Sequence, residues 1–167
     1  PIRRALKIKT FFNMLGPLVN PSFPKHQFIG VYNLELARLY NYLYQLSDIR
    51  YAIVHSLDGY DEVSLTADFK YIDNGVEEII SPDELGFEVT VPEELNGGTT
   101  VKEAADIFLE TLLGKGTKAR TNIVIANSLL ALKCVNHGKT REECTFRVCL
   151  IIFNFWLYLS GNDMNDN

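Results

Sequence analysis

The fold class is decided by residues 26–55, which read HQFIGVYNLELARLYNYLYQLSDIRYAIVH. The stretch opens with a short apolar run, His26 to Tyr32, which is typical of a buried strand. Apolar side chains then recur at helical spacing and predict a helix over residues 34–46 whose core face is formed by Leu36, Leu39, Tyr40 and Leu43. A second apolar run from Tyr51 to His55 predicts another buried strand. Strand, helix and strand with short connections are typical of a βαβ unit, so we expect an α/β fold.

A β-hairpin is predicted directly downstream. Residues 69–72 and 76–80 are two strand-like runs that flank Asp73-Asn74-Gly75. An Asn-Gly step supplies the positive φ angles that a tight hairpin turn needs. Because hairpin strands are antiparallel, the expected architecture is a parallel or mixed sheet flanked by helices, with the hairpin as an insertion.

Helices are predicted for the second half of the chain. Thr100-Val101-Lys102-Glu103 is a capping box that starts a helix ending near Gly114. Gly114-Lys115-Gly116-Thr117 lacks the spacing of a phosphate-binding loop and is interpreted as a helix-to-helix connection. Residues 119–135 are apolar on almost every face, which indicates a buried helix. A second capping box at residues 140–143 predicts one more helix.

Composition excludes several classes of protein. The chain has 167 residues, 47% of them hydrophobic and 22% charged, as expected for one globular domain. Its net charge of −5 argues against a general nucleic-acid binder. Three cysteines without metal-ligand spacing, Cys134, Cys144 and Cys149, indicate a reducing, cytoplasmic compartment. No signal peptide is visible, and the apolar run at residues 146–159 is too short for a membrane span.

Two segments resemble a known family. Residues 10–21 read TFFNMLGPLVNP and residues 58–64 read DGYDEVS. Together they resemble the second half of the anthranilate phosphoribosyltransferases, from Arg3 to about Thr145. The resemblance implies a partial catalytic domain over residues 1–145, of the nucleoside phosphorylase and phosphoribosyltransferase C-terminal-domain type. Because the sequence enters the family pattern in its middle, the chain is expected to be a fragment.

Asp61 and Glu62 are the predicted metal ligands. Adjacent carboxylates just after a strand can reach one hard cation, and Mg²⁺ suits such a pair because it takes one or two carboxylates and bridges to substrate phosphates. Taken alone, the dipeptide would be interpreted as a solvated surface loop. Its setting matches the family segment Asp-Gly-x-Asp-Glu-x-Ser, and by this resemblance Asp61 and Glu62 are the magnesium carboxylates.

Arg3, Gly16 and Pro17 are the predicted anthranilate-binding residues. A guanidinium can hold a carboxylate with two parallel hydrogen bonds, and by resemblance Arg3 falls where the family has its substrate-binding arginine. Lys7 and Lys9 depart from the glycine and arginine that the family usually has there. Gly16-Pro17 corresponds to residues that line the anthranilate pocket, although a Gly-Pro turn needs no ligand to explain it.

The resemblance implies transfer of the phosphoribosyl group from phosphoribosyl pyrophosphate to anthranilate in tryptophan biosynthesis. The family's Gly-Thr-Gly-Gly-Asp loop and Lys-His-Gly-Asn segment do not occur in this sequence. The helical domain through which the family is usually homodimeric is not covered either, so little or no activity is expected of this chain alone. Two alternatives are a related enzyme such as a pyrimidine nucleoside phosphorylase and a non-catalytic α/β module for protein association.

Residues 146–167 form an atypical end. An apolar, aromatic run without helical period is followed by a polar tail. The corresponding family segment is an amphipathic helix, so we interpret this end as the product of a shifted reading frame or a misassembled gene. Translating the other two frames of the coding DNA tests this hypothesis, and it is wrong if neither frame restores an amphipathic pattern.

Overall fold

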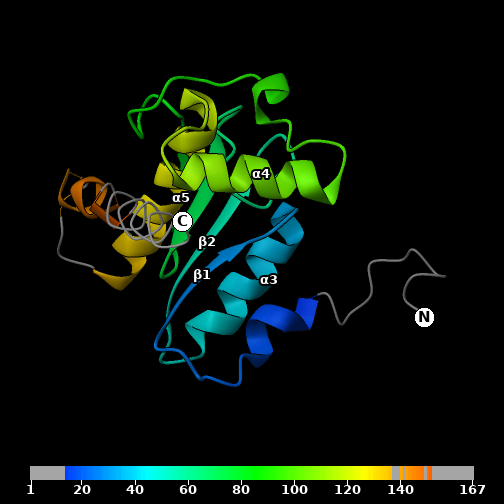
Figure 1. Cartoon of the computed structure of the whole chain (residues 1–167). Coiled ribbons are helices and arrows are strands. Elements are labelled where there is room, and N and C mark those ends of the chain that lie inside the picture. Colours follow the sequence, from blue (N-terminus) through cyan, green and yellow to red (C-terminus); the bar gives the residue numbers. More distant parts are fainter. Residues whose placement is uncertain (1–13, 137–139, 141, 149, 152–167) are drawn as a thin grey trace, which may run out of the picture.

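The computed structural model describes residues 14–136, 140, 142–148, 150 and 151. Its elements are η1 (Gly16–Val19), β1 (His26–Gly30), α3 (Leu34–Gln45), β2 (Arg50–Ser56), β3 (Phe69–Asp73), β4 (Val76–Ile80), η2 (Pro92–Leu95), α4 (Val101–Leu112) and α5 (Lys118–Val135). The strands form one sheet in the order β1-β2-β3-β4 (Figure 1). β1 and β2 are parallel, whereas β3 pairs antiparallel with both β2 and β4. The predicted mixed α/β sheet is confirmed.

Helix α3 connects the two parallel strands, as the βαβ pattern predicts. Its first turn is capped by Asn33, whose side chain accepts a 2.8 Å hydrogen bond from the Leu36 N–H. The predicted buried face is only partly right, because Leu36 and Tyr40 are buried but Leu39 and Leu43 are exposed. The face consists of Leu36, Ala37, Tyr40, Asn41 and Tyr44. Both tyrosine hydroxyls find backbone carbonyls, at Met14 and Pro17, which permits these large rings to be buried.

The β3–β4 hairpin turns at the predicted residues. Asn74 has φ 49° and Gly75 has φ 95°, the left-handed conformations that the Asn-Gly step supplies. β3 lies inside the sheet and is largely buried, while β4 forms one edge and is mostly exposed. Tyr51 of β2 packs under the turn, and its hydroxyl donates to the Asn41 side chain at 2.6 Å.

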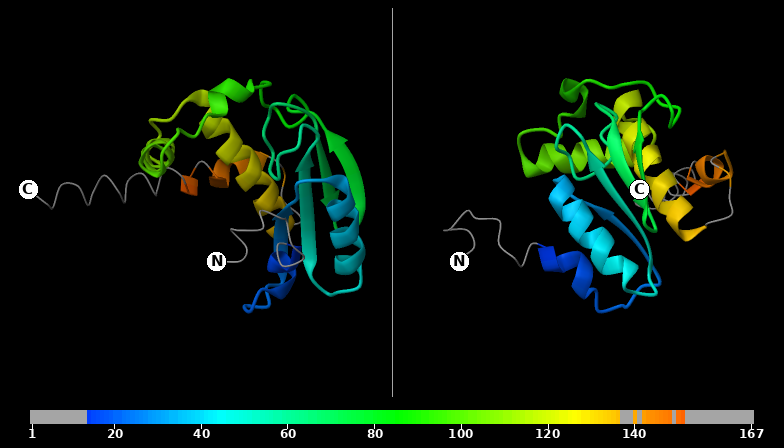
Figure 2. Two further views of the ribbon diagram at one scale, coloured as in Figure 1. Left: turned by 90° about the vertical axis from the view of Figure 1, so that its right-hand side faces the viewer. Right: turned by 180° about the vertical axis from the view of Figure 1, so that it is seen from behind.

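The sheet is the middle of three layers, with α3 on one face and α5 on the other (Figure 2). Successive strand residues point to opposite faces, so each strand contributes to two cores. The core on the α3 side includes Ile29, Val31, Leu36, Ala37, Tyr40, Tyr44, Tyr51, Ile53 and Ile72. The core on the α5 side includes Ala52, Val54, Val63, Leu65, Phe69, Tyr71, Leu85, Ala126, Leu129, Leu130, Cys134 and Cys144.

Helices α4 and α5 begin as predicted. Thr100 and Glu103 form a complete capping box, and Thr117 caps α5 after the connection at residues 114–117. The predicted burial of α5 is only partly right, because one face is buried and most other positions are half-buried. α4 is more exposed than its apolar period suggests. Val101 is 89% and Phe108 61% exposed, so the structure leaves the apolar side of α4 largely uncovered.

The second predicted capping box is also present. The Thr140 N–H donates to Glu143 and the Glu143 N–H donates back to the Thr140 hydroxyl, and residues 142–148 are helical. Among the described positions of this segment, Cys144 and Val148 are buried. Residues 152–167 lie outside the described part. Among the residues that the structure describes, no helix is both long and apolar enough to cross a membrane.

Candidate functional site

Asp61 and Glu62 lie in the loop that connects β2 to β3, here called the acidic loop (residues 57–68). The loop leaves β2 at its carboxyl end, next to the carboxyl end of the parallel strand β1. Ligands of open α/β sheets typically bind beyond these strand ends. Both acidic residues are exposed, while Val63, Ser64 and Leu65 directly after them are buried. The carboxylates therefore project from a segment that is anchored in the core.

The first anchor is the close approach of β1 to the loop at Gly30. A Cβ atom added to Gly30 would lie 1.6 Å from the backbone oxygen of Asp61, far inside any permitted contact. Only glycine allows this approach. The Asp61 peptide is thereby placed directly against the last residue of β1.

The second anchor is a group of hydroxyls beneath the loop. The Ser56 hydroxyl donates a 2.6 Å hydrogen bond to the Glu62 carbonyl. Ser64 donates to Ser56 from both its backbone N–H, at 3.2 Å, and its hydroxyl, at 3.1 Å. Thr66 donates to the Asp58 carboxylate, which closes the loop on itself. Ser56 and Ser64 are fully buried, so these bonds satisfy groups that have no access to water.

The third anchor comes from helix α5. The Asn127 side chain accepts from the Val63 N–H at 3.0 Å and donates to the Val63 carbonyl at 2.9 Å. Its second N–H is within 3.0 Å of the Ile123 carbonyl on its own helix. The Asn127 amide therefore pairs with both backbone groups of Val63, as a residue of a neighbouring β-strand would, although Asn127 belongs to a helix.

Leu65, three residues after Glu62, anchors the acidic loop in the core. Its side chain is completely buried, yet its φ is 60°, in the left-handed region that non-glycine residues rarely adopt. Its carbonyl accepts a 2.8 Å hydrogen bond from the Thr90 N–H. Such backbone strain persists only where the surroundings fix it, and it is often found at functional sites.

The electrostatics of Glu62 fit a cation site. Although the Glu62 side chain is exposed, the surrounding loop removes part of the water from its carboxylate, and this desolvation, followed by the adjacent charge of Asp61, raises the pKa of Glu62 above its ordinary value. Both effects disfavour the ionised pair, and a bound cation offsets both. The described residues contain no group of three or more His, Cys, Asp or Glu that could hold a metal. Two carboxylates completed by water and substrate phosphates are the set that Mg²⁺ accepts.

Replacement of Glu62 is expected to stabilise the metal-free chain near pH 7. Because the folded-state pKa of Glu62 is raised, its ionisation costs stability as the pH rises above the ordinary glutamate value. Glu62→Gln should therefore raise the free energy of unfolding at pH 7 by less than about 1 kcal/mol, since solvent screens the site, and the gain should vanish near pH 4. Urea unfolding with EDTA at both pH values measures it.

Glu84→Gln is the matched control, for which the opposite change in the free energy of unfolding is expected. The Ser81 backbone N–H donates to the Glu84 carboxylate at 2.8 Å and, with the Ser81 hydroxyl, lowers its pKa. This variant should lose stability at pH 7. A destabilised Glu62→Gln chain at pH 7 would contradict the account of Glu62.

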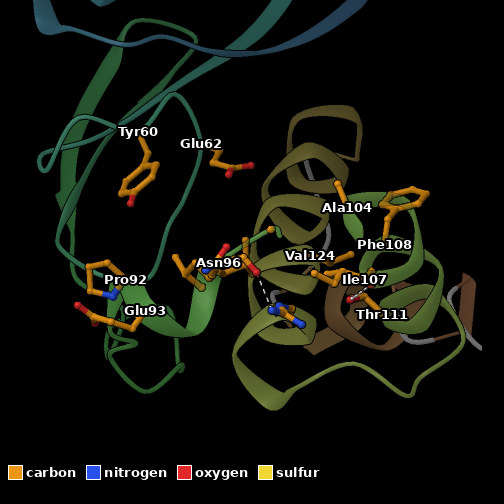
Figure 3. A pocket seen from close by; sticks show the side chains of 14 residues that line it. Tyr60, Glu62, Pro92, Glu93, Asn96, Ala104, Ile107, Phe108, Thr111 and Val124 are labelled. Atoms are coloured by element: carbon orange, nitrogen blue, oxygen red, sulfur yellow. Dashed lines mark hydrogen bonds between the residues drawn. The ribbon is translucent and has the colours of Figure 1, made fainter. Parts of the chain in front are cut away.

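A cleft of about 640 Å³ opens beside Glu62 (Figure 3). Tyr60 and Glu62 form one wall, and η2, α4 and the first turns of α5 form the others. Most of the lining is apolar, with Phe108 and Ile107 on the α4 side. Arg120 is a cation in the lining, and it donates a 2.6 Å hydrogen bond to the Asn96 carbonyl. The cleft places Glu62 next to a space large enough for a small ligand.

The other predicted site residues are not brought to the acidic loop within the described part of the chain. Gly16 and Pro17 start η1, and the Pro17 carbonyl accepts from Gln27 in β1 and from the Tyr44 hydroxyl at 3.1 Å. They lie near the amino end of β1, whereas Gly30 and the acidic loop lie at its carboxyl end. Arg3 is outside the described residues.

Gly30, Ser56 and Asn127 are site residues that the sequence patterns did not indicate. Gly30 falls within the run that predicts an apolar strand and Asn127 within the segment that predicts a buried helix, and neither pattern singles the residue out. A glycine at the end of a strand that precedes a loop is a weak signal of close backbone approach. An asparagine within a helix otherwise apolar on most faces is a second such signal, because a buried amide needs partners.

Comparisons with known proteins identify the family of this chain. A sequence model of the glycosyl transferase family, a/b domain, matches residues 1–152. An anthranilate phosphoribosyltransferase from Flavobacterium psychrophilum is 53% identical over 137 residues, which are 82% of this chain and 42% of that protein. The chain thus spans less than half the length of this relative. The resemblance predicted from residues 10–21 and 58–64 is confirmed.

Solved structures show the same fold. Anthranilate phosphoribosyltransferase from Saccharomyces cerevisiae in complex with PRPP and Mg superposes with a TM-score of 0.75 at 23% identity, over 93% of this chain and 47% of that one. The same yeast enzyme in complex with 4-fluoroanthranilate gives 0.77 at 25% identity, over 92% and 46%. With the α/β sheet, the anchored acidic loop and the match over residues 1–152, the chain belongs to the glycosyl transferase family and represents its α/β domain.

Proposed function

We propose that this chain supplies the metal carboxylates and part of the anthranilate pocket of an anthranilate phosphoribosyltransferase. The observation that carries the proposal is the pair of exposed carboxylates, Asp61 and Glu62, on a loop fixed to the core at three consecutive residues. Two relatives of that name are 53% and 49% identical to this chain over the 137 and 142 residues that align. A yeast relative has been solved with PRPP and Mg, the ligands that such a carboxylate pair suits.

The proposed reaction is a displacement at the anomeric carbon of phosphoribosyl pyrophosphate. The amino nitrogen of anthranilate forms a bond to this carbon, the bond from the carbon to the pyrophosphate oxygen breaks, and the electron pair leaves with pyrophosphate. The amine then releases a proton. Mg²⁺ would neutralise the charge that develops on the leaving group. Asp61 and Glu62 would hold the cation, and the rigid loop would keep both oxygens in place without reorganisation.

By the family resemblance, anthranilate would be held by Arg3, Gly16 and Pro17, of which Gly16 and Pro17 lie near the amino end of β1 in this structure, away from the acidic loop. Two parallel hydrogen bonds from the Arg3 guanidinium would fix its carboxylate. Support for anthranilate as the acceptor comes from the yeast relative solved with 4-fluoroanthranilate. The Gly-Thr-Gly-Gly-Asp and Lys-His-Gly-Asn segments are absent from these 167 residues, so we expect little or no transferase activity from the chain by itself. Cys134 and Cys144 are buried free thiols, which suits a cytoplasmic enzyme.

Binding of Mn²⁺·phosphoribosyl pyrophosphate tests the proposed metal site. Mn²⁺ replaces Mg²⁺ and is counted by electron paramagnetic resonance after equilibrium dialysis. We expect the chain to bind the complex and the double variant Asp61→Asn/Glu62→Gln to lose at least 10-fold in affinity, because it lacks both proposed metal carboxylates. Equal binding by the double variant would refute the proposal.

The uncovered apolar side of α4 favours one second candidate, a non-catalytic association module. Val101, Phe108 and Leu109 are exposed on this helix, and such patches often mark interaction sites. This candidate predicts binding of a protein partner that Phe108→Asp abolishes and that does not depend on Asp61 or Glu62. Metal-dependent binding of phosphoribosyl pyrophosphate favours the transferase instead.

A further inference from the structure

Three consecutive residues of the acidic loop are each fixed by a different element. The Asp61 carbonyl packs closely against Gly30 of β1. Ser56 of β2 donates a hydrogen bond to the Glu62 carbonyl, and Asn127 of α5 pairs with both backbone groups of Val63. The first two contacts come from the strands beside the loop. The third joins the loop to a helix 64 residues further along the chain, and it involves the residue directly after Glu62.

The Asn127 amide has one orientation that satisfies its surroundings. Its oxygen accepts from the Val63 N–H, and its two N–H groups donate to the Val63 and Ile123 carbonyls. A neutral amide alone offers a donor and an acceptor side by side at this reach. Aspartate would place a carboxylate against the Val63 carbonyl, and aliphatic residues would leave both Val63 groups without a partner.

We infer that Asn127 is a positioning residue for the divalent-cation site, acting through Val63 on the Glu62 carboxylate. The inference rests on the proposed metal role of Asp61 and Glu62. The peptide between Glu62 and Val63 is held at its carbonyl by Ser56 and at its N–H by Asn127, so the Glu62 side chain starts from a fixed backbone. A carboxylate that begins in place loses less conformational entropy when it binds a cation.

Asn136, the C-cap residue of the same helix, provides a control. Its side chain also donates to a carbonyl four residues earlier, that of Leu132 at 3.2 Å, and no bond from it to the acidic loop is present in the structure. Asn127→Ala and Asn136→Ala each remove this intrahelical bond, but only the first removes the loop contact. Asn127→Ser separates the intrahelical hydrogen bond from the loop contact. A hydroxyl can still donate to the preceding turn, as Thr111 does to Ile107, but is too short for Val63.

The experiment measures the dissociation constant of Mn²⁺·pyrophosphate by equilibrium dialysis, together with hydrogen exchange of the Val63 amide. Loss of groups that orient metal ligands typically weakens metal binding about 10- to 100-fold. We expect a loss in this range for Asn127→Ser and Asn127→Ala, faster Val63 exchange in both, and a change of less than twofold for Asn136→Ala. Affinity is expressed per folded molecule, with the folded fraction taken from urea unfolding.

The outcomes separate this inference from the proposed function. If Asp61→Asn/Glu62→Gln loses binding but both Asn127 variants bind within twofold of the unchanged chain, Asn127 has no positioning role and the metal site stands. If the double variant binds as well as the unchanged chain, or the unchanged chain does not bind, the proposed metal site is wrong and the role of Asn127 falls with it. If Asn136→Ala weakens binding as much as Asn127→Ala, the effect belongs to the helix and overturns the inference.

Discussion

Gly30→Ala is expected to displace the acidic loop and to lower both stability and metal affinity. The new methyl group would lie 1.6 Å from the Asp61 carbonyl oxygen, and the contact is to backbone, so no side-chain rotation relieves it. Either the end of β1 or the Asp61 peptide must move. Overpacking of this kind costs on the order of 3 kcal/mol. Urea unfolding measures this loss, and Mn²⁺·pyrophosphate dialysis should show weaker binding at the same time.

Gly97→Ala is the control for Gly30→Ala. A Cβ atom at Gly97 meets no heavy atom within 4 Å. The free energy of unfolding of the Gly97→Ala variant should therefore stay within about 0.5 kcal/mol of that of the unchanged chain. A Gly30→Ala chain with the stability of Gly97→Ala would show that the loop does not depend on close approach at β1.

Leu65→Ala is expected to have a comparably large effect. Leu65 is fully buried beside Val63 and Phe69 in the core on the α5 side, and truncation of a buried leucine costs about 2–5 kcal/mol. Alanine disfavours a left-handed φ of 60° as leucine does, and the variant loses the packing that holds the backbone in this conformation. The loop is therefore expected to relax away from this conformation, with weaker Mn²⁺·pyrophosphate binding in addition to the stability loss.

Leu85→Ala separates core packing from the loop. Leu85 is 6% exposed and belongs to the same core, but it lies outside residues 57–68. Its truncation should cost stability in the same range and leave the metal affinity per folded molecule within twofold. If Leu65→Ala behaves like Leu85→Ala in both measurements, Leu65 contributes only to packing.

Much of the fold could be predicted because its signals are local in the chain. The turn needs positive φ at Asn74 and Gly75, which the dipeptide supplies, and each capping box lies within four residues. The core face of α3 was predicted in part, since Leu36 and Tyr40 are buried as expected, whereas Leu39 and Leu43 are exposed. The structure buries Tyr44 in addition, and the Tyr40 and Tyr44 hydroxyls reach carbonyls of residues 14–17. Helical spacing carries no information about such distant partners.

The candidate site likewise consists of residues that a local sequence pattern indicates and residues that only the fold brings together. Asp61 and Glu62 could be proposed because adjacent carboxylates after a strand form a local pattern that also matches a family segment. The contacts of Gly30 with Asp61 and of Asn127 with Val63 join residues 31 or more positions apart, and only the folded chain brings them together. The exposure of α4 was also unpredictable, since an apolar period shows that a face can be buried but not what covers it.

Paramagnetic broadening by Mn²⁺·pyrophosphate tests most directly whether the cation binds at the acidic loop. Amide signals of the ¹⁵N-labelled chain are followed during the titration, because Mn²⁺ broadens the nuclei nearest to it. We predict that the amides of Asp61, Glu62 and Val63 broaden first and those of Gln27 and Tyr44, at the other end of the sheet, last. Earlier broadening at the acidic η2 residues Glu93 and Glu94, or equal broadening throughout, would contradict a cation site at Asp61 and Glu62.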